Sequence, residues 1–251
     1  MPGTVSTELD SGVATLRFGH PKGNSLPGAL LRQIAEQVTQ LSANTDAHVI
    51  VLRSEGTGPF CAGASFDELV AIADPAAGKE FFMGFARLIL AMTRCPKLIV
   101  ARAHGKAVGG GVGVLAASDY VLATSDASVK LSELAVGIGP FVVGPVIERK
   151  IGLAAFSQLA IDASGWRDAE WAMRHGLFAE VHQSTSALDE RVAALARTLA
   201  GSNPEAMQRM KQVFWQGTEG WPVLLEQRAE MSGTLVLSEF TRRAIARFQA
   251  R

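Results

Sequence analysis

Three consecutive glycines, at positions 109 to 111, are the residues whose type and placement first suggest chemistry. They follow residues 98–103, a short apolar run with β-branched residues that predicts a buried strand, and they stand where the pattern turns helical. Glycine lets a ligand approach the backbone, and the first N–H groups of a helix lack internal partners. The junction could therefore hold a developing negative charge, although a glycine triplet alone more often marks a tight packing turn.

A second run of small residues could act together with the glycine triplet. Residues 61–64, Cys-Ala-Gly-Ala, follow another apolar strand at residues 49–52 and close a loop that could present a second backbone N–H. Two N–H groups aimed at one oxygen form an oxyanion hole. The two loops together predict a site for acyl thioester chemistry.

Glu133 is the acid that could serve such a site. A lone glutamate in a short segment is exposed by default, because Glu is seldom buried unpaired. Its apolar neighbours, Leu131 and Leu134 among them, make a desolvated setting plausible, and desolvation raises a carboxyl pKa toward the range of a useful base. Asp119, at the mouth of a strand, is instead expected to cap or brace the structure.

Composition excludes several classes of protein. The 251 residues are 48% hydrophobic and suffice for one large domain or two small ones. Lys plus Arg and Asp plus Glu each number 24, and this zero net charge argues against nucleic acid as a partner. Two cysteines, Cys61 and Cys95, are expected as reduced thiols in a cytoplasmic protein. We expect no membrane segment and no metal site, because neither a long apolar run nor a metal-ligand spacing occurs.

Short strands alternate with helices along the first part of the chain. Residues 4–8 and 13–18 predict an antiparallel hairpin. Further elements are expected as strands at 49–52, 98–103 and 120–123 and as helices at 30–41, 66–73, 81–92 and directly after the glycines. This order predicts an α/β fold with crossovers, and composition does not distinguish a doubly wound sheet from a spiral.

The pattern becomes helical from Gly144 onward. Residues 202–205, Ser-Asn-Pro-Glu, are typical of a helix start, with proline in the first turn. Trp215, Trp221 and Leu224 are expected in packing or subunit contacts.

Four motifs resemble the enoyl-CoA hydratase/isomerase, or crotonase, superfamily in their order and spacing. They are FCAGAS at 60–65, AxGxxxGGG at 103–111, SDYVLA at 118–123 and SELAVGIGP at 132–140. The resemblance covers nearly the whole chain. It implies an α/β fold of ββα units wound into a superhelix, or spiral, over residues 1–165. It also implies a helical region over residues 166–251 that packs on the spiral and helps to form a homotrimer or a dimer of trimers.

The resemblance further implies an acyl-CoA thioester as substrate, with coenzyme A as part of that substrate and no separate cofactor. The loop with Lys22, Asn24 and Ser25 lies where the family's coenzyme A contacts begin. Lys22 could pair with a phosphate there, or it could be a solvated lysine in a turn. Ala62 and Pro140 are implied as further substrate contacts.

The oxyanion donors are also implied by the resemblance. The N–H groups of Ala64 and Gly110 match the family's two donors residue by residue. The family commonly has Asp where this chain has Ser65. We expect this difference to alter the support of the loop but not the hole, because the donors belong to the main chain.

The acid pattern differs from that of the family's hydratases, which hold the attacking water between two glutamates. The first of these positions is Gly113 in this chain, beside the expected acyl pocket, and the second is Glu133. A single carboxylate above an enolate can take a proton from one carbon and return it to another. The single acid therefore favours an enoyl-CoA isomerase.

Other functions stay open at this point. Hydration, or decarboxylation of a carboxy-acyl-CoA, could use the same enolate. A binding or scaffold protein that has lost its chemistry is a further alternative, although it would have no need of both small-residue loops and Glu133. The length and branching of the acyl group cannot be read from the sequence.

Overall fold

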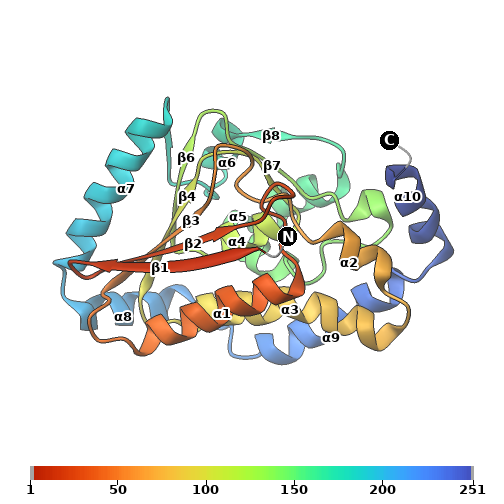
Figure 1. Ribbon diagram of the computed structural model, residues 1–251, viewed down its shortest axis with the longest axis horizontal. Helices are drawn as coiled ribbons and strands as arrows, with labels where there is room; N and C mark the ends of the chain where they lie inside the picture. Colours follow the sequence, from red (N-terminus) through yellow and green to blue (C-terminus); the bar gives the residue numbers. More distant parts are fainter. Residues whose placement is uncertain (1–2, 250–251) are drawn as a thin grey trace.

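The protein is built on a six-stranded sheet with the spatial order β1-β2-β3-β4-β6-β9. Figure 1 shows the computed structural model, in which residues 3–249 are described. β1 runs antiparallel to β2, as the predicted hairpin requires, and the other neighbouring strands are parallel. The bounds of the strands are Thr4–Asp10 (β1), Val13–Gly19 (β2), Val49–Ser54 (β3), Leu98–Ala103 (β4), Tyr120–Thr124 (β6) and Glu180–His182 (β9).

Both faces of this sheet are covered by helices. Ile50 and Leu52 of β3 belong to the larger core, which α1 (Gly28–Ala43) and α3 (Pro75–Arg94) close. Val49 and Val51 point the other way, because successive strand residues alternate, and they pack with Leu188 of α7 (Thr185–Ala200). Figure 1 shows α7 across the sheet from α1 and α3. Burial on both faces explains why the parallel strands read as continuous apolar runs.

A second, three-stranded sheet carries the glycine triplet. Its order is β5 (Ala107–Val108), β7 (Ser128–Lys130) and β8 (Arg167–Asp168), with β5 parallel to β7 and β8 antiparallel to it. α4 (Gly110–Ala116) begins two residues after β5, and all of its residues are buried. The strand, glycine and helix order predicted for this stretch is therefore confirmed, with a short extra strand between β4 and the glycines.

The C-terminal region is mostly helical, but the prediction of helix from Gly144 onward was incomplete. β8 and β9 lie within this region, and β9 pairs with β6 at the edge of the main sheet. These strands have two and three residues, which is too short for the alternation that identifies a strand. Both sheets therefore continue past residue 165. The helices are α5 (Gly144–Ile161), α6 (Ala169–Arg174), α8 (Pro204–Phe214), α9 (Trp221–Leu235) and α10 (Glu239–Gln249).

A pair of glycines holds α9 directly against α3. A Cβ built at Gly78 would lie 2.6 Å from the carbonyl oxygen of Gly233, and one built at Gly233 would lie 2.4 Å from the backbone nitrogen of Lys79. Any larger residue at either position would push the helices apart, so glycine is required for this close approach. The contact fixes α9 beside the first half of α3.

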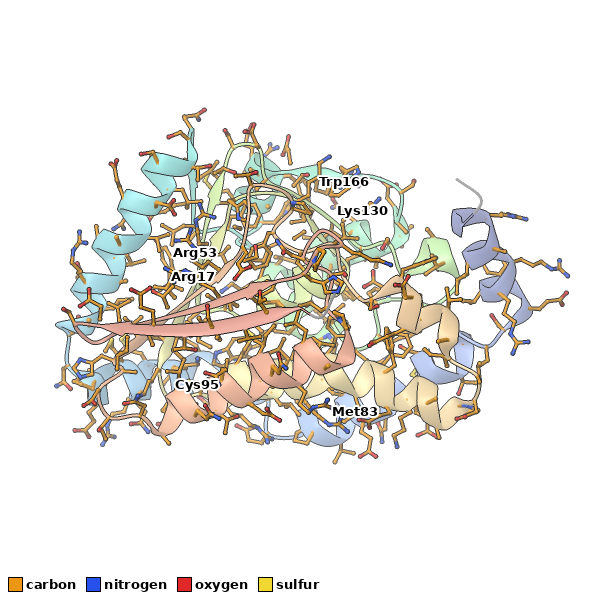
Figure 2. The ribbon with its side chains drawn as sticks, in the orientation of Figure 1. Arg17, Arg53, Met83, Cys95, Lys130 and Trp166 are labelled. Atoms are coloured by element: carbon orange, nitrogen blue, oxygen red, sulfur yellow. The ribbon has the colours of Figure 1, made fainter. Side chains whose placement is uncertain are left out.

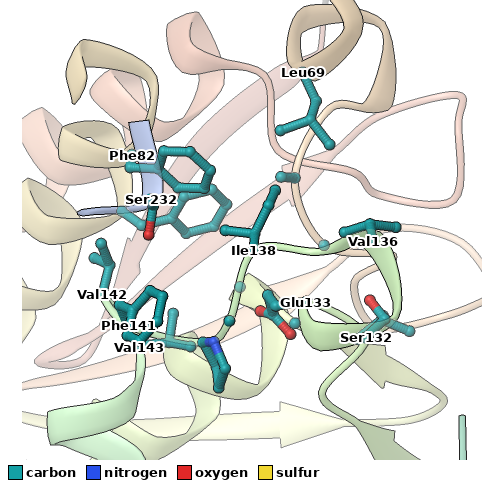
Figure 3. A pocket seen from close by; sticks show the side chains of 18 of the residues that line it. Leu69, Phe82, Ser132, Glu133, Val136, Ile138, Phe141, Val142, Val143 and Ser232 are labelled. Atoms are coloured by element: carbon teal, nitrogen blue, oxygen red, sulfur yellow. The ribbon is translucent and has the colours of Figure 1, made fainter. Parts of the chain in front are cut away.

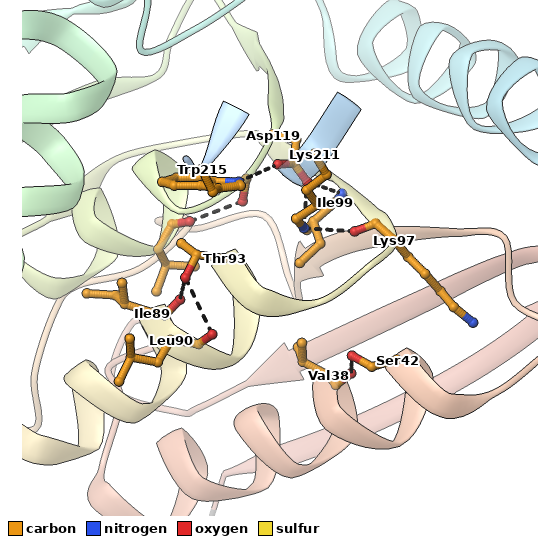
Figure 4. Close-up of polar contacts among 12 residues, drawn as sticks. Val38, Ser42, Ile89, Leu90, Thr93, Lys97, Ile99, Asp119, Lys211 and Trp215 are labelled. Carbon is orange, nitrogen blue, oxygen red and sulfur yellow. Dashed lines mark hydrogen bonds and ion pairs between the residues drawn. The ribbon is translucent and has the colours of Figure 1, made fainter. Parts of the chain in front are cut away.

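Asp119 is buried just before β6, and both of its carboxylate oxygens have donors (Figure 4). Oδ1 accepts a hydrogen bond from Nε1 of Trp215 at 3.0 Å, and Oδ2 accepts one from the backbone N–H of Ile99 at 2.7 Å. Nζ of Lys211 lies 2.8 Å from Oδ2 and also donates to the carbonyl of Lys97 at 2.8 Å. Asp119 thus joins α8 to β4 and β6, which is the bracing role expected for it.

Trp215 and Trp221 are each only 9% exposed. Their rings pack edge to face with centroids 6.0 Å apart, so both act as packing residues within the subunit. Figure 2 gives the wider view of side chains around the sheet and helices. Among the described helices, none is both long and apolar enough to cross a membrane.

Candidate active site

A largely apolar cavity of about 180 Å³ lies beside the start of α4. Its wall combines the two small-residue loops, α2 (Phe66–Ala71), the first half of α3, the segment after β7 and α9 (Figure 3). Segments that are distant in the sequence therefore meet here. The lining residues include Ala62, Gly63, Ala64, Phe66, Leu69, Phe82, Phe85, Val108, Gly109, Gly110, Ser132, Glu133, Val136, Ile138, Pro140, Phe141, Val142, Val143 and Ser232.

Backbone hydrogen bonds fasten the two loops to each other. The N–H of Cys61 donates to the carbonyl of Lys106 at 3.1 Å, and the N–H of Val108 donates to the carbonyl of Cys61 at 2.9 Å. Gly63 adopts a positive φ of 93°, and a Cβ built there would lie 2.9 Å from the carbonyl oxygen of Val108. It would also lie 4.0 Å from the nitrogen of Gly110. Only glycine permits this approach, and the approach brings the two loops together.

The N–H groups of Ala64 and Gly110 lie in the wall of this cavity. Gly110 is the first residue of α4, after Gly109 with a φ of 53°, so its N–H has no acceptor within the helix. Across residues 3–249, neither N–H donates to a protein acceptor. Two free N–H groups beside one cavity can bind the oxygen of a thioester carbonyl.

Glu133 lies against the same loop. A Cβ built at Gly109 would lie 2.8 Å from Oε1 of Glu133, so the carboxyl group packs directly on that glycine. Its backbone starts a 3₁₀ turn, η1 (Leu134–Val136), and its carbonyl accepts hydrogen bonds from the N–H groups of Val136 and Ile138. Gly137, with a φ of 82°, ends the turn in the left-handed conformation that favours glycine. The turn fixes where the carboxyl group points.

One oxygen of the Glu133 carboxyl group, Oε2, is desolvated and unpaired. The residue is half-buried overall, but Oε2 is inaccessible to solvent and has no hydrogen-bond partner among the described residues. Burial raises the pKa of Glu133 from 4.5 to about 7, because the charged form loses hydration that the residue's own backbone N–H replaces only in part. A carboxyl group with this pKa can both accept and donate a proton near neutral pH.

The expected coenzyme A loop holds itself together through its own polar side chains. Lys22 forms an exposed ion pair with Asp67. Asn24, at a φ of 55°, donates from its amide to the carbonyls of Glu55 and Pro59, each at 2.9 Å. Oγ of Ser25 lies 2.9 Å from Nδ1 of His20. None of the three predicted residues lines the cavity, so any substrate contact from them lies outside it.

The other predicted site residues divide into two groups. Ala62, Ala64, Gly110, Glu133 and Pro140 all line the cavity. Gly113 does not, because the side chain of Val143 stands between them. A Cβ built at Gly113 would lie 2.6 Å from Cγ1 of Val143.

Cys61 takes no part as a nucleophile, because burial raises the pKa of its thiol to about 12.

Most of the cavity wall was absent from the sequence-based prediction. Phe82 and Phe85 come from α3, Phe141 from the segment after η1, and Ser232 from α9. Helical periodicity marks the phenylalanines only as an apolar face, which is typical of any core helix. No group of three or more metal-ligating side chains is arranged around an ion site in the described part of the chain.

The sequence of this chain is similar to those of known proteins from one family. The sequence model of the enoyl-CoA hydratase/isomerase family matches residues 8–247. The chain is 28% identical, over 84% of its length and 83% of the relative, to a (7aS)-7a-methyl-1,5-dioxo-2,3,5,6,7,7a-hexahydro-1H-indene-carboxyl-CoA hydrolase from Mycobacterium tuberculosis. It is 30% identical, over 84% of its length and 68% of the relative, to mitochondrial methylglutaconyl-CoA hydratase from Rattus norvegicus.

The fold has a close counterpart among solved structures. The crystal structure of enoyl-CoA hydratase from Bacillus halodurans matches with a TM-score of 0.89 at 23% identity, covering 97% of this chain and 99% of that one. This match confirms the expected crotonase-type α/β fold with C-terminal helices. The family match extends over nearly the whole chain, and we conclude that the protein belongs to the enoyl-CoA hydratase/isomerase family.

Proposed function

We propose that the protein is an enoyl-CoA isomerase, which moves a double bond along the acyl chain of a coenzyme A thioester. The observation that carries this proposal is the single unpaired carboxyl group of Glu133 beside two free N–H groups. Glu133 is the only Asp or Glu among the residues that line the described cavity. One acid suffices for proton transfer between two carbons.

The proposed reaction begins on a 3-enoyl-CoA. The Glu133 carboxylate takes a proton from C2, and the electrons of that C–H bond move toward the thioester oxygen to form a dienolate. The N–H groups of Ala64 and Gly110 stabilise the charge on that oxygen. Glu133, now protonated, gives its proton to C4, and the electrons return to form the C2–C3 double bond. No atom is gained or lost, so one residue completes the cycle.

Substrate binding and assembly are parts of the same proposal. Coenzyme A would pass the loop with Lys22, Asn24 and Ser25, and a phosphate would compete with Asp67 for the Lys22 ammonium group. We also propose assembly as a homotrimer or a dimer of trimers. Support comes from large apolar side chains that remain exposed on α5 and α8, namely Leu153, Ile161, Val213 and Phe214.

Direct assay of the purified protein tests the proposed reaction. The rate of 3-enoyl-CoA to 2-enoyl-CoA conversion is compared with the rate of water addition to the 2-enoyl-CoA of the same length. We expect the shift of the double bond to be the faster reaction. Faster hydration would refute the isomerase assignment and leave the family membership intact.

Hydration is the second candidate, because a relative at 30% identity is named as a hydratase. It needs a second group to hold water, which Gly113→Glu could supply. Because Val143 occupies the space beside Gly113, the change is combined with Val143→Ala, and Val143→Ala alone is the control. A gain of hydration in the double variant only would mean that the pocket is hydratase-like and lacks one acid. A variant with unchanged isomerisation and coenzyme A affinity would mean that position 113 faces away from the acyl group.

A further inference from the structure

Ser232 is the residue that α9 contributes to the wall of the described cavity, whose only other polar side chains are those of Ser132 and Glu133. The residue is only 1% exposed, it borders the cavity, and none of the side-chain hydrogen bonds among the described residues involves its hydroxyl. Several other helical hydroxyls in this protein bond to the carbonyl four residues earlier, as Ser42 does to Val38 at 2.8 Å and Thr234 does to Glu230 at 3.0 Å. Ser232 departs from this local pattern. Its hydroxyl is therefore available to a ligand.

The position of this hydroxyl is fixed by the backbone. Gly233, the next residue, is the one that contacts Gly78 of α3. Figure 3 shows Ser232 beside Phe82, with its oxygen directed toward the space above Phe141 and Val142. The hydroxyl thus faces the cavity from a rigid helix contact.

Ser232 and Glu133 both line the cavity, and Figure 3 shows them apart, with Ile138 between them. In the proposed function the thioester lies at the Glu133 side, between the N–H groups of Ala64 and Gly110. An acyl group that fills the cavity then extends toward Phe82 and Ser232. The atoms that reach Ser232 are those remote from the thioester.

We propose that Ser232 recognises an oxygen substituent, oxo or hydroxyl, on the acyl group at the end remote from the thioester. This inference rests on the proposed acyl-CoA function and names the class of substrate. A hydroxyl that an acyl chain covers without pairing it is costly, and a substrate oxygen that bonds to the hydroxyl avoids this cost. An all-carbon chain leaves the hydroxyl unpaired, so the site favours the oxygenated chain over its hydrocarbon analogue.

The cavity volume limits the size of this acyl group. An apolar protein cavity of roughly 150 Å³ holds one benzene molecule. The cavity of about 180 Å³ here is slightly larger, so it accommodates an acyl portion of about six carbons. Hexanoyl-CoA and its oxo derivatives are therefore suitable probes, and as saturated thioesters they offer no double bond to isomerise or hydrate.

The test compares dissociation constants by calorimetry for hexanoyl-CoA, 4-oxohexanoyl-CoA and 5-oxohexanoyl-CoA. For the unmodified protein we expect one oxo compound to bind roughly fivefold to tenfold more tightly than hexanoyl-CoA, the effect of one neutral hydrogen bond. Ser232→Ala should lose this preference and retain its affinity for hexanoyl-CoA. Thr234→Ala, on the exposed side of the same helix, is the matched control and should keep the preference. Ser232→Cys, which keeps the size but weakens the hydrogen bond, should also lose it.

The outcomes separate the two proposals. If hexanoyl-CoA binds but neither oxo compound is preferred, or if Ser232→Ala keeps the preference, the role of Ser232 is refuted and the acyl-CoA function stands. If none of the three thioesters binds to the unmodified protein, the acyl-CoA function is refuted, and the role of Ser232 with it.

Discussion

Asp119 and Glu133 are two buried acids of the same chain, and their surroundings differ completely. The Asp119 carboxylate accepts hydrogen bonds from Trp215 and Ile99 and pairs with Lys211. Oε2 of Glu133 has no partner within residues 3–249, and burial raises the pKa of that group to about 7. A fully paired acid contributes to the fold, whereas an unpaired acid beside a cavity costs stability and can exchange a proton with a ligand. The partners of a buried acid therefore indicate its role better than its burial does.

Replacing each acid by its amide separates the two roles, and the largest effect is expected at Glu133. Glu133→Gln keeps the size of the side chain but cannot carry a proton between carbons. We expect turnover of a 3-enoyl-CoA to fall by about 10² to 10⁴, with coenzyme A affinity nearly unchanged. Steady-state kinetics and calorimetry measure the two quantities. Substantial residual turnover would mean that another group moves the proton.

Asp119→Asn is the matched change at the bracing acid. It leaves the Lys211 ammonium group, which is 2% exposed, without a counter-charge. Breaking a buried ion pair on one side costs about 3–5 kcal/mol, so urea unfolding should show a loss of this size. Folded Asp119→Asn should still isomerise its substrate at close to the normal rate. An unchanged free energy of unfolding would show that the pair does not brace the fold.

The pH dependence of stability gives a smaller effect with a defined sign. The pKa of Glu133 is raised in the folded state, so folding favours the protonated group. The stabilisation that Glu133 gives the folded state through its raised pKa is fully present below about pH 4.5. It is lost as the pH rises to about 7. A shift of this size corresponds to about 3–4 kcal/mol. We expect the free energy of unfolding, compared with that of Glu133→Gln, to fall by this amount between pH 4 and pH 8. A parallel pH dependence in both proteins would mean that Glu133 is solvated.

Ala64, Gly110 and Glu133, which the structure places around one cavity, were identified from the sequence because each lies in a local motif. Gly110 and Ala64 follow strands that are evident from their apolar runs, and Glu133 lies in a contiguous motif. The Ser232 side of the cavity could not be predicted in this way. Ser232 reaches the cavity only because Gly78 and Gly233 bring two distant helices into contact, and no pattern in the sequence indicates that these two glycines meet.

In the fold, too, elements with a clear local sequence pattern were predicted, and elements that depend on distant contacts were not. The hairpin and the strands β3, β4 and β6 were predicted within a few residues. β8 and β9 were missed because their sequences are too short to show the alternation typical of a strand. Their pairing with β7 and β6 defines them as strands. Gly113 was expected beside the acyl pocket, yet Val143 stands between it and the cavity. Such a placement depends on the packing of α4 against the segment that leads into α5.

The central claim is that the lone, unpaired carboxyl group of Glu133 moves the proton, and the pH dependence of kcat/KM tests it most directly. The base must be ionised to start the reaction, so the isomerisation rate of a 3-enoyl-CoA should rise with pH and level off above an apparent pKa of about 7. The small residual rate of Glu133→Gln should lack this inflection. An inflection near pH 4.5 in the unmodified protein, or one near pH 7 that persists in Glu133→Gln, would contradict the claim.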